Sequence, residues 1–174
     1  MKKVLFKETQ QFREWWQIVF VLGSTVLSMI VCLYALFQQT VRGVQVGQSP
    51  APNGVLIAVI IGLCIFLVIW FSMKLEVWID LEGIYYRFFP LIQKNKFISK
   101  EEILRFEIRK YKAKWEYGGR GIRTGFGKKW GRAYSVSGNL GLQLYLKNGK
   151  KVLFGTQRQQ AIMYAMDEIM KQKR

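Results

Sequence analysis

The residues with the clearest potential for chemistry lie in a glycine-rich stretch, residues 117–141, which reads YGGRGIRTGFGKKWGRAYSVSGNLG. It holds eight of the 16 glycines and five basic side chains. A Walker phosphate loop needs Gly-Lys followed by Ser or Thr, whereas Gly127-Lys128 is followed by Lys129. A dinucleotide loop needs a helix after its glycines, and antiparallel strands are predicted on both sides here. The stretch therefore does not predict a nucleotide site.

Catalytic groups are scarce throughout the chain. There is no histidine, and the two cysteines, Cys32 and Cys64, lie inside long apolar runs. Glu116 is the one carboxylate beside the glycines, and Arg123 is its candidate ion-pair partner. A single glutamate without a base, a reactive thiol or a second carboxylate supports no named mechanism. We expect a protein that is not an enzyme and that binds no metal and no cofactor.

Two runs, residues 15–37 and residues 55–73, contain no charged side chain. As helices they measure about 34 Å and about 28 Å, and the hydrocarbon core of a bilayer is about 30 Å thick. The first run is too long for the apolar part of a secretory signal. Both runs are predicted to be transmembrane helices.

Basic residues predict the orientation of these helices. The link between them, residues 38–54, carries only Arg42, whereas residues 1–14 carry four Lys or Arg and residues 74–174 carry 22. Positively charged segments stay on the cytoplasmic side. The sequence therefore predicts an external loop at 38–54, a cytoplasmic N-terminal segment at 1–14 and a cytoplasmic domain at 74–174.

The pattern in the cytoplasmic domain changes to alternation of apolar and polar residues. This period of two predicts strands, at residues 75–80, 83–89, 97–103, 104–111, 140–146 and 150–155. Asn148-Gly149 predicts a type I′ hairpin turn, in which both residues have positive φ.

A helix is predicted near the C-terminus, beginning near Gln157. Thr156 and Gln159 have the spacing of a capping box. Apolar residues then recur at helical spacing on one face: Ile162, Ala165, Met166, Ile169 and Met170. The fold class is therefore a membrane helical hairpin plus an α+β domain of about seven antiparallel strands closed by this helix.

Residues 115–157 resemble a known family. WEYGGRGIR, followed by AYSVSGNLGLQLYLKNGKKVLFGTQ, is similar to bacterial membrane-anchored pleckstrin-homology-like domain proteins. Over about residues 75–174 the resemblance implies a pleckstrin-homology-like barrel with a C-terminal helix, and it implies location in the bacterial inner (cytoplasmic) membrane. Phosphoinositide-binding members of the wider superfamily use basic residues in the first hairpin loop. The first predicted loop here, Asp80 to Gly83, is short and acidic.

The glycine-rich stretch has two expected roles. Gly118, Gly119 and Gly121 permit positive φ and shape the backbone. The basic side chains form a membrane-facing or partner-facing surface, because ten basic and two acidic residues lie between Arg105 and Arg132. The candidate binding residues are Arg120, Arg123, Lys128, Lys129, Trp130 and Arg132.

These observations predict an integral membrane protein that presents a basic, non-catalytic interaction module to anionic lipid headgroups. An acidic protein partner or a second copy of the chain remains an open alternative for this surface. A membrane-tethered nucleic-acid-binding domain is the runner-up, because the same charges would attract phosphates and the aromatic residues would stack on bases.

Overall fold

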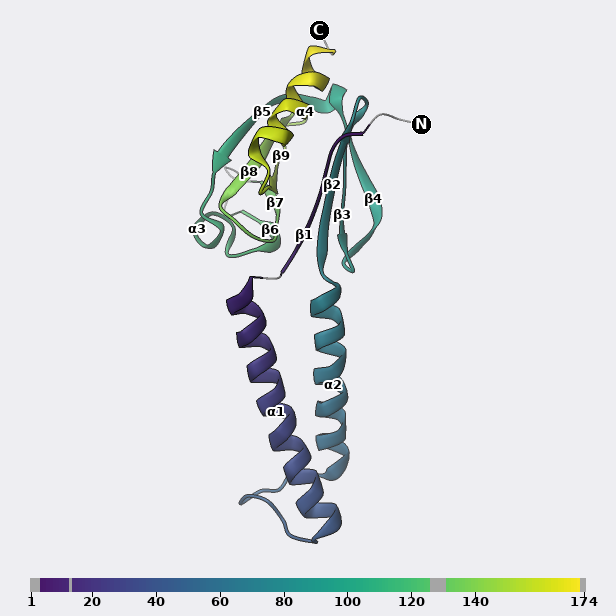
Figure 1. Ribbon diagram of the computed structural model, residues 1–174, viewed down its shortest axis with the longest axis vertical. Helices are drawn as coiled ribbons and strands as arrows, with labels where there is room; N and C mark the ends of the chain where they lie inside the picture. The colour runs from purple at the N-terminus through teal and green to yellow at the C-terminus, as the bar shows by residue number, and fades with distance from the viewer. Residues whose placement is uncertain (1–3, 13, 126–130, 173–174) are drawn as a thin grey trace. The chain divides into compact units, whose positions relative to one another are not determined.

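The computed structural model describes residues 4–12, 14–125 and 131–172 (Figure 1). The chain divides into two compact units. The helical unit is Arg13–Ser72, and the β unit consists of Met1–Phe12 together with Met73–Arg174. The β unit is thus assembled from both sides of the helical unit in the sequence.

The helical unit contains two antiparallel helices, α1 (Trp15–Val41) and α2 (Asn53–Ser72). Both are long and apolar enough to cross a membrane, with mean hydropathies of 2.3 and 3.0. They begin and end within a few residues of the predicted spans. The main difference is that α1 continues to Val41.

Two sheets build the β unit. The first contains β1 (Val4–Gln11), β2 (Lys74–Asp80), β3 (Gly83–Phe89) and β4 (Ile92–Ser99), in that order and all antiparallel. The second has the order β5-β8-β9-β7-β6, with bounds β5 Ile103–Lys110, β6 Gly121–Thr124, β7 Arg132–Ser135, β8 Leu140–Leu146 and β9 Lys151–Gly155. The β7–β9 pair is parallel, which the antiparallel prediction missed. In the described part of the chain the two sheets share no strand, so a closed barrel is not present there.

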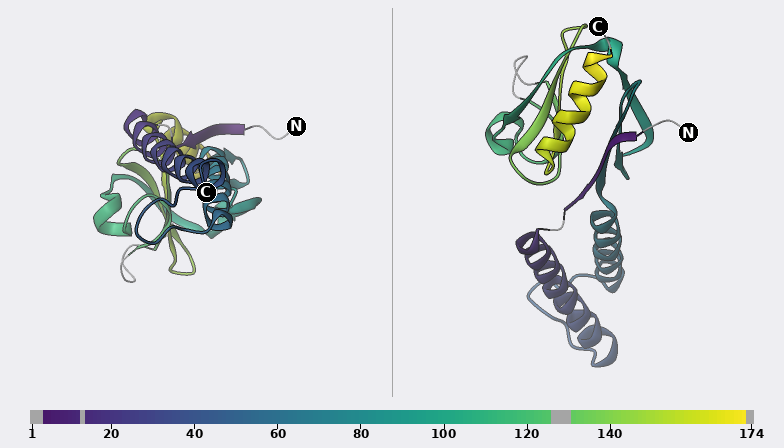
Figure 2. Two further views of the ribbon diagram at one scale, coloured as in Figure 1. Left: turned by 90° about the horizontal axis from the view of Figure 1, so that it is seen from below. Right: turned by 45° about the horizontal axis from the view of Figure 1, so that its top comes forward.

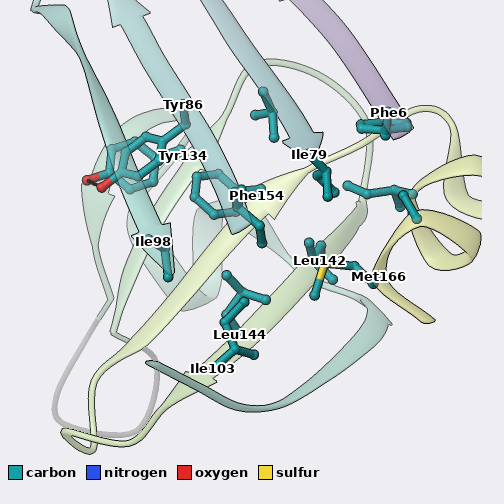
Figure 3. Close-up of a cluster of buried hydrophobic side chains, with 14 of the residues drawn as sticks. Phe6, Ile79, Tyr86, Ile98, Ile103, Tyr134, Leu142, Leu144, Phe154 and Met166 are labelled. Carbon is teal, nitrogen blue, oxygen red and sulfur yellow. Dashed lines mark hydrogen bonds between the residues drawn. The ribbon is translucent and has the colours of Figure 1, made fainter. Parts of the chain in front are cut away.

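A continuous apolar core lies between the sheets and α4 (Gln159–Lys171). The helix contacts β1 and β2 of the first sheet and β5 and β8 of the second (Figure 2). Its predicted apolar face is confirmed, because Ile162, Ala165, Met166 and Ile169 are all buried. Figure 3 shows Met166 of this helix beside Leu142, with Phe154 and the rings of Tyr86 and Tyr134 further along the same core.

The first strand, β1, comes from residues that the sequence pattern left as a separate N-terminal segment. Phe6 enters the core, but the next two inward positions are Glu8 and Gln10, both buried. Because two of its inward residues are polar, β1 lacks the apolar alternation by which the other strands are predicted.

The start of α4 also differs from its prediction. The helix begins at Gln159, and Thr156 does not form a capping box with it. The Thr156 hydroxyl instead donates to Glu8 Oε2 at 2.7 Å and accepts from the Arg158 N–H at 3.1 Å. The Gln157 N–H donates to Glu8 Oε1 at 2.9 Å. The acceptor for this turn therefore comes from β1.

The hairpin between β8 and β9 is confirmed, but its turn type is not type I′. Gly149 has φ 76°, whereas no described residue other than glycine has positive φ, so Asn148 does not have it. The Gly149 N–H donates to the Leu146 carbonyl at 2.9 Å. This arrangement suits a type I turn followed by a left-handed glycine.

Candidate functional site

The residues predicted to form the binding surface occupy different places. Arg120 precedes β6 and is partly buried, and Arg123 on β6 is exposed and donates from Nε to the Arg120 carbonyl at 3.2 Å. Arg132 is exposed on β7, where it pairs with Thr124. Lys128, Lys129 and Trp130 lie outside the described residues. The structure thus places Arg120 and Arg123 in contact, and Arg132 lies one position further along the β6–β7 ladder, next to Ala133, which pairs with Arg123.

The glycines before and at the start of β6 have the predicted positive φ: 70° at Gly118, 131° at Gly119 and 105° at Gly121. The first two end the short helix α3 (Ala113–Tyr117), which the sequence pattern did not predict. The Gly118 N–H donates to the Lys114 carbonyl at 3.1 Å, and the Gly119 N–H donates to the Ala113 carbonyl at 2.9 Å. These glycines therefore have a structural role.

Gly131 provides a test of that structural role. It has φ 74°, and a Cβ there would collide with the Lys151 backbone carbonyl. Gly138 has φ 77° but open space around its Cβ position, so it is a matched control. A left-handed residue other than glycine costs about 1–2 kcal/mol, and about 1 kcal/mol lowers Tm by roughly 4–8 °C in a domain of this size. We expect Gly131→Ala to lower Tm clearly more than Gly138→Ala in thermal melts. Equal falls in Tm for the two variants would mean that the backbone moves away from the new Cβ at position 131 without a loss of stability.

A polar network fixes α3 to the second sheet. Arg109 Nη1 on β5 contacts Glu116 Oε2 on α3 at 2.8 Å, and Glu116 Oε1 accepts from the Lys112 N–H at 2.8 Å. Arg109 Nη2 donates to the Tyr117 hydroxyl and to Gln143 Oε1 of β8, each at 3.1 Å. Burial raises the pKa of Tyr117, so its hydroxyl stays neutral. The ion-pair partner of Glu116 is therefore Arg109, and the predicted pair with Arg123 is wrong.

The outer surface around α3 is basic and carries an exposed aromatic residue. Trp115 is 80% exposed, and Lys110, Lys112 and Lys114 are all exposed. Our sequence prediction counted these lysines within a basic stretch but did not single them out. The available signal was the spacing of Lys110, Lys112 and Lys114 directly before a tryptophan.

Several carboxylates of the β unit serve its structure. Glu76 contacts Lys74 at 2.9 Å and also Arg87. Burial opposes ionisation of Glu76, but hydrogen bonds and charge from Arg87 and Lys74 outweigh it and lower its pKa. Asp80 accepts the N–H groups of the turn that follows it, at 2.9 and 3.1 Å, and Glu107 accepts the Tyr145 hydroxyl at 2.7 Å. With Glu8 and Glu116, these groups are committed to structural contacts.

A cavity of about 580 Å³ lies against the β8–β9 hairpin. Its lining includes Tyr86, Tyr134, Arg132, Lys150 and Lys151. The two tyrosine hydroxyls are 3.5 Å apart, and burial raises the pKa of Tyr86. A hydrogen bond to Tyr134 raises the pKa of Arg132, which stays charged.

The described residues contain no cluster of three His, Cys, Asp or Glu side chains placed to hold a metal ion. Comparison with known proteins adds no identity, since no protein-family model and no curated protein sequence matches this chain.

Proposed function

We propose that this protein is a membrane-anchored, non-catalytic interaction module whose β unit binds anionic lipid headgroups. One observation carries the proposal. Carboxylates such as Glu8, Glu76 and Glu116 are committed to internal contacts, while many basic side chains of the same unit are exposed. The formal net charge of the chain is +16. A surface of this kind attracts anionic partners over about a Debye length.

Strand pairing supports the membrane topology of the proposal. β1 precedes the helical unit and β2 follows it, yet the two strands are neighbours in one sheet. Both ends of the helical hairpin must then lie on one side of the membrane, as two spans require. The distribution of Lys and Arg supports the cytoplasm as this side, and the family resemblance supports the bacterial inner membrane as the location.

The pleckstrin-homology-like class is part of the same proposal. A four-stranded antiparallel sheet, a second sheet and a C-terminal helix that contacts both are consistent with it. The strand order changes one earlier inference. Asp80–Gly83 joins the second and third strands, so it is not the first hairpin loop. The connection between the first two strands is the helical unit itself.

A soluble form of the β unit tests lipid binding. We define the excised β unit as the chain in which residues 13–72 are replaced by a four-residue glycine-containing turn. It should sediment with vesicles that contain anionic lipid at ~0.1 M salt and be released at ~1 M, where the Debye length falls to about 3 Å. It should not sediment with neutral vesicles. Equal binding to neutral vesicles, or retention of RNA in preference to vesicles, would refute the proposal.

A pair of charge-reversal variants tests the predicted residues within that experiment. Converting Arg120, Arg123, Lys128, Lys129 and Arg132 to Glu should weaken vesicle binding. The matched control reverses five exposed lysines elsewhere, namely Lys7, Lys94, Lys96, Lys147 and Lys171. Both sets change the net charge by ten units, so a larger loss in the first set assigns binding to the glycine-rich stretch. Equal losses of vesicle binding in the two variants would mean that binding depends on the overall charge and not on these residues.

A further inference from the structure

We infer that α3 is a second membrane contact of this protein, in which Trp115 enters the headgroup region of an anionic bilayer and the neighbouring lysines bind lipid phosphates. The inference rests on the proposed function, because it requires the helical unit to span that bilayer. It concerns residues other than those that the sequence singled out.

A row of paired residues links the end of β5, which leads into α3, to β1 and β2, which lead into the helical unit. Gln10 on β1 pairs with Leu75 on β2, and its side-chain Nε2 donates to the Gly155 carbonyl of β9 at 2.7 Å. Gly155 pairs with Gly141 on β8, and Gly141 pairs with Arg109 on β5. These residues therefore form one row across the β unit.

On one side of that row, three strands continue toward two different elements. Lys110 leads to α3, while Gln11 and Lys74 lead to the helical unit. Within the β unit, α3 lies at the end where β1 ends and β2 begins (Figure 1). Three residues separate β1 from α1, and Met73 alone separates α2 from β2. At about 3.5 Å per residue, connections this short keep Gln11 and Lys74 themselves close to the bilayer that the helices would cross, and α3 belongs to the same end of the β unit as these two residues.

The chemistry of the α3 surface suits the headgroup region. Tryptophan combines a large apolar ring with one N–H donor, and it is enriched where a membrane meets water. Trp115 is the most exposed of the large hydrophobic side chains described in the β unit, at 80%. Lys110, Lys112 and Lys114 precede it in the sequence, and anionic lipids attract such cations.

The contacts that Glu116 makes with Arg109 and with the Lys112 N–H hold α3 in place. They also neutralise the one acidic side chain of α3. Glu116 is paired with Arg109 at 2.8 Å, so it does not repel lipid phosphates. The Glu116 contact with the Lys112 N–H and the glycine end at Gly118 hold the short helix in place. A surface that is already ordered loses little conformational freedom when it binds.

Site-directed spin labelling of the full chain in lipid vesicles tests the inference. Cys32 and Cys64 are free thiols and are first replaced by Ala. A nitroxide is then attached at Lys114→Cys, beside Trp115, and in a second protein at Leu104→Cys. Leu104 is 61% exposed and lies at the opposite end of β5 from α3, so it is a matched control. Collisions with oxygen report the lipid phase, and collisions with a water-soluble nickel complex report water.

We expect the ratio of oxygen to nickel collisions to be several-fold higher at position 114 than at position 104 in vesicles with anionic lipid. Adding Trp115→Ser should return the ratio at 114 to that at 104, while Trp115→Phe should preserve part of the difference. Thermal melts of these exposed-site variants should match the parent. A label at 114 that is as accessible to nickel as the label at 104 would overturn the inference, even if the excised β unit binds anionic vesicles. Failure of that vesicle binding would refute the proposed function separately.

Discussion

Deleting residues 1–12 should prevent the rest of the β unit from folding, because these residues supply β1. Removing β1 takes Phe6 out of the core, where it is 4% exposed. Loss of a buried phenylalanine side chain costs about 3–5 kcal/mol. Deletion also exposes the edge of β2, which is paired with β1 along its length. Together these losses approach the free energy of unfolding of a whole domain, which is about 5–15 kcal/mol.

The loss of Glu8 adds to this effect. Glu8 is 8% exposed, and its carboxylate accepts from the Thr156 hydroxyl, the Gln157 N–H and the Gln10 side-chain amide at 2.7–2.9 Å. Without it, two groups at the start of α4 have lost their acceptor, at a cost of about 1–3 kcal/mol each if they stay buried. The first strand therefore stabilises the last helix.

Two soluble proteins measure the prediction. One is residues 73–174 alone, and the other is the excised β unit, which keeps β1. The short turn is feasible because Gln11 and Lys74 are direct partners in the ladder. Circular dichroism during heating should show a cooperative transition for the excised β unit and none for residues 73–174. A cooperative transition at the same temperature in both would mean that β1 is dispensable.

Ile169→Asp should also unfold the β unit. Ile169 is fully buried on α4 and belongs to the main core cluster. Placing a carboxylate there either buries a charge or forces the helix away from the sheets, at a cost of several kcal/mol. In the excised β unit we expect loss of the cooperative melt or a fall in Tm of more than 10 °C, since about 1 kcal/mol corresponds to roughly 4–8 °C.

Tyr164→Asp is the control for this substitution. Tyr164 lies on the same helix and is 69% exposed, so the same carboxylate remains in water there. Surface substitutions usually change stability by less than about 0.5 kcal/mol. Tyr164→Asp should therefore melt close to the parent. If Ile169→Asp melted like Tyr164→Asp, the predicted apolar face of α4 would not be its buried face.

Local patterns predicted the elements whose inward residues are uniformly apolar. In β2 the inward residues Leu75, Val77 and Ile79 alternate with others and are all buried. The same holds for Leu142 and Leu144 in β8, and for the buried face of α4 at helical spacing. Burial of one face imposes a periodicity on the residues of that face, so the sequence alone identifies these elements.

Register irregularities limited the prediction for β5. Simple alternation over the predicted strand 104–111 places Leu104 on the apolar, inward face, but Leu104 is 61% exposed and Ile103 is fully buried. The pairing of β5 with β8 shifts register between Ile103 and Arg105. A register shift of one residue moves the side chains of a strand to the opposite face of the sheet. The local alternation of apolar and polar residues does not show where such a shift occurs.

What the sequence by itself determined is the division between long charge-free helices and a basic β unit, since apolar length and charge are local properties. Only the tertiary structure decided that residues 4–11 complete this unit, because the inward Glu8 gains its acceptor role from Thr156 and Gln157, 148 and 149 residues away in the chain. The position of α3 was also decided only by the tertiary structure, because its Glu116 pairs with Arg109 near the end of β5. Partners that meet through sheet pairing leave no periodic signal, so their roles emerge only when the strands are placed side by side.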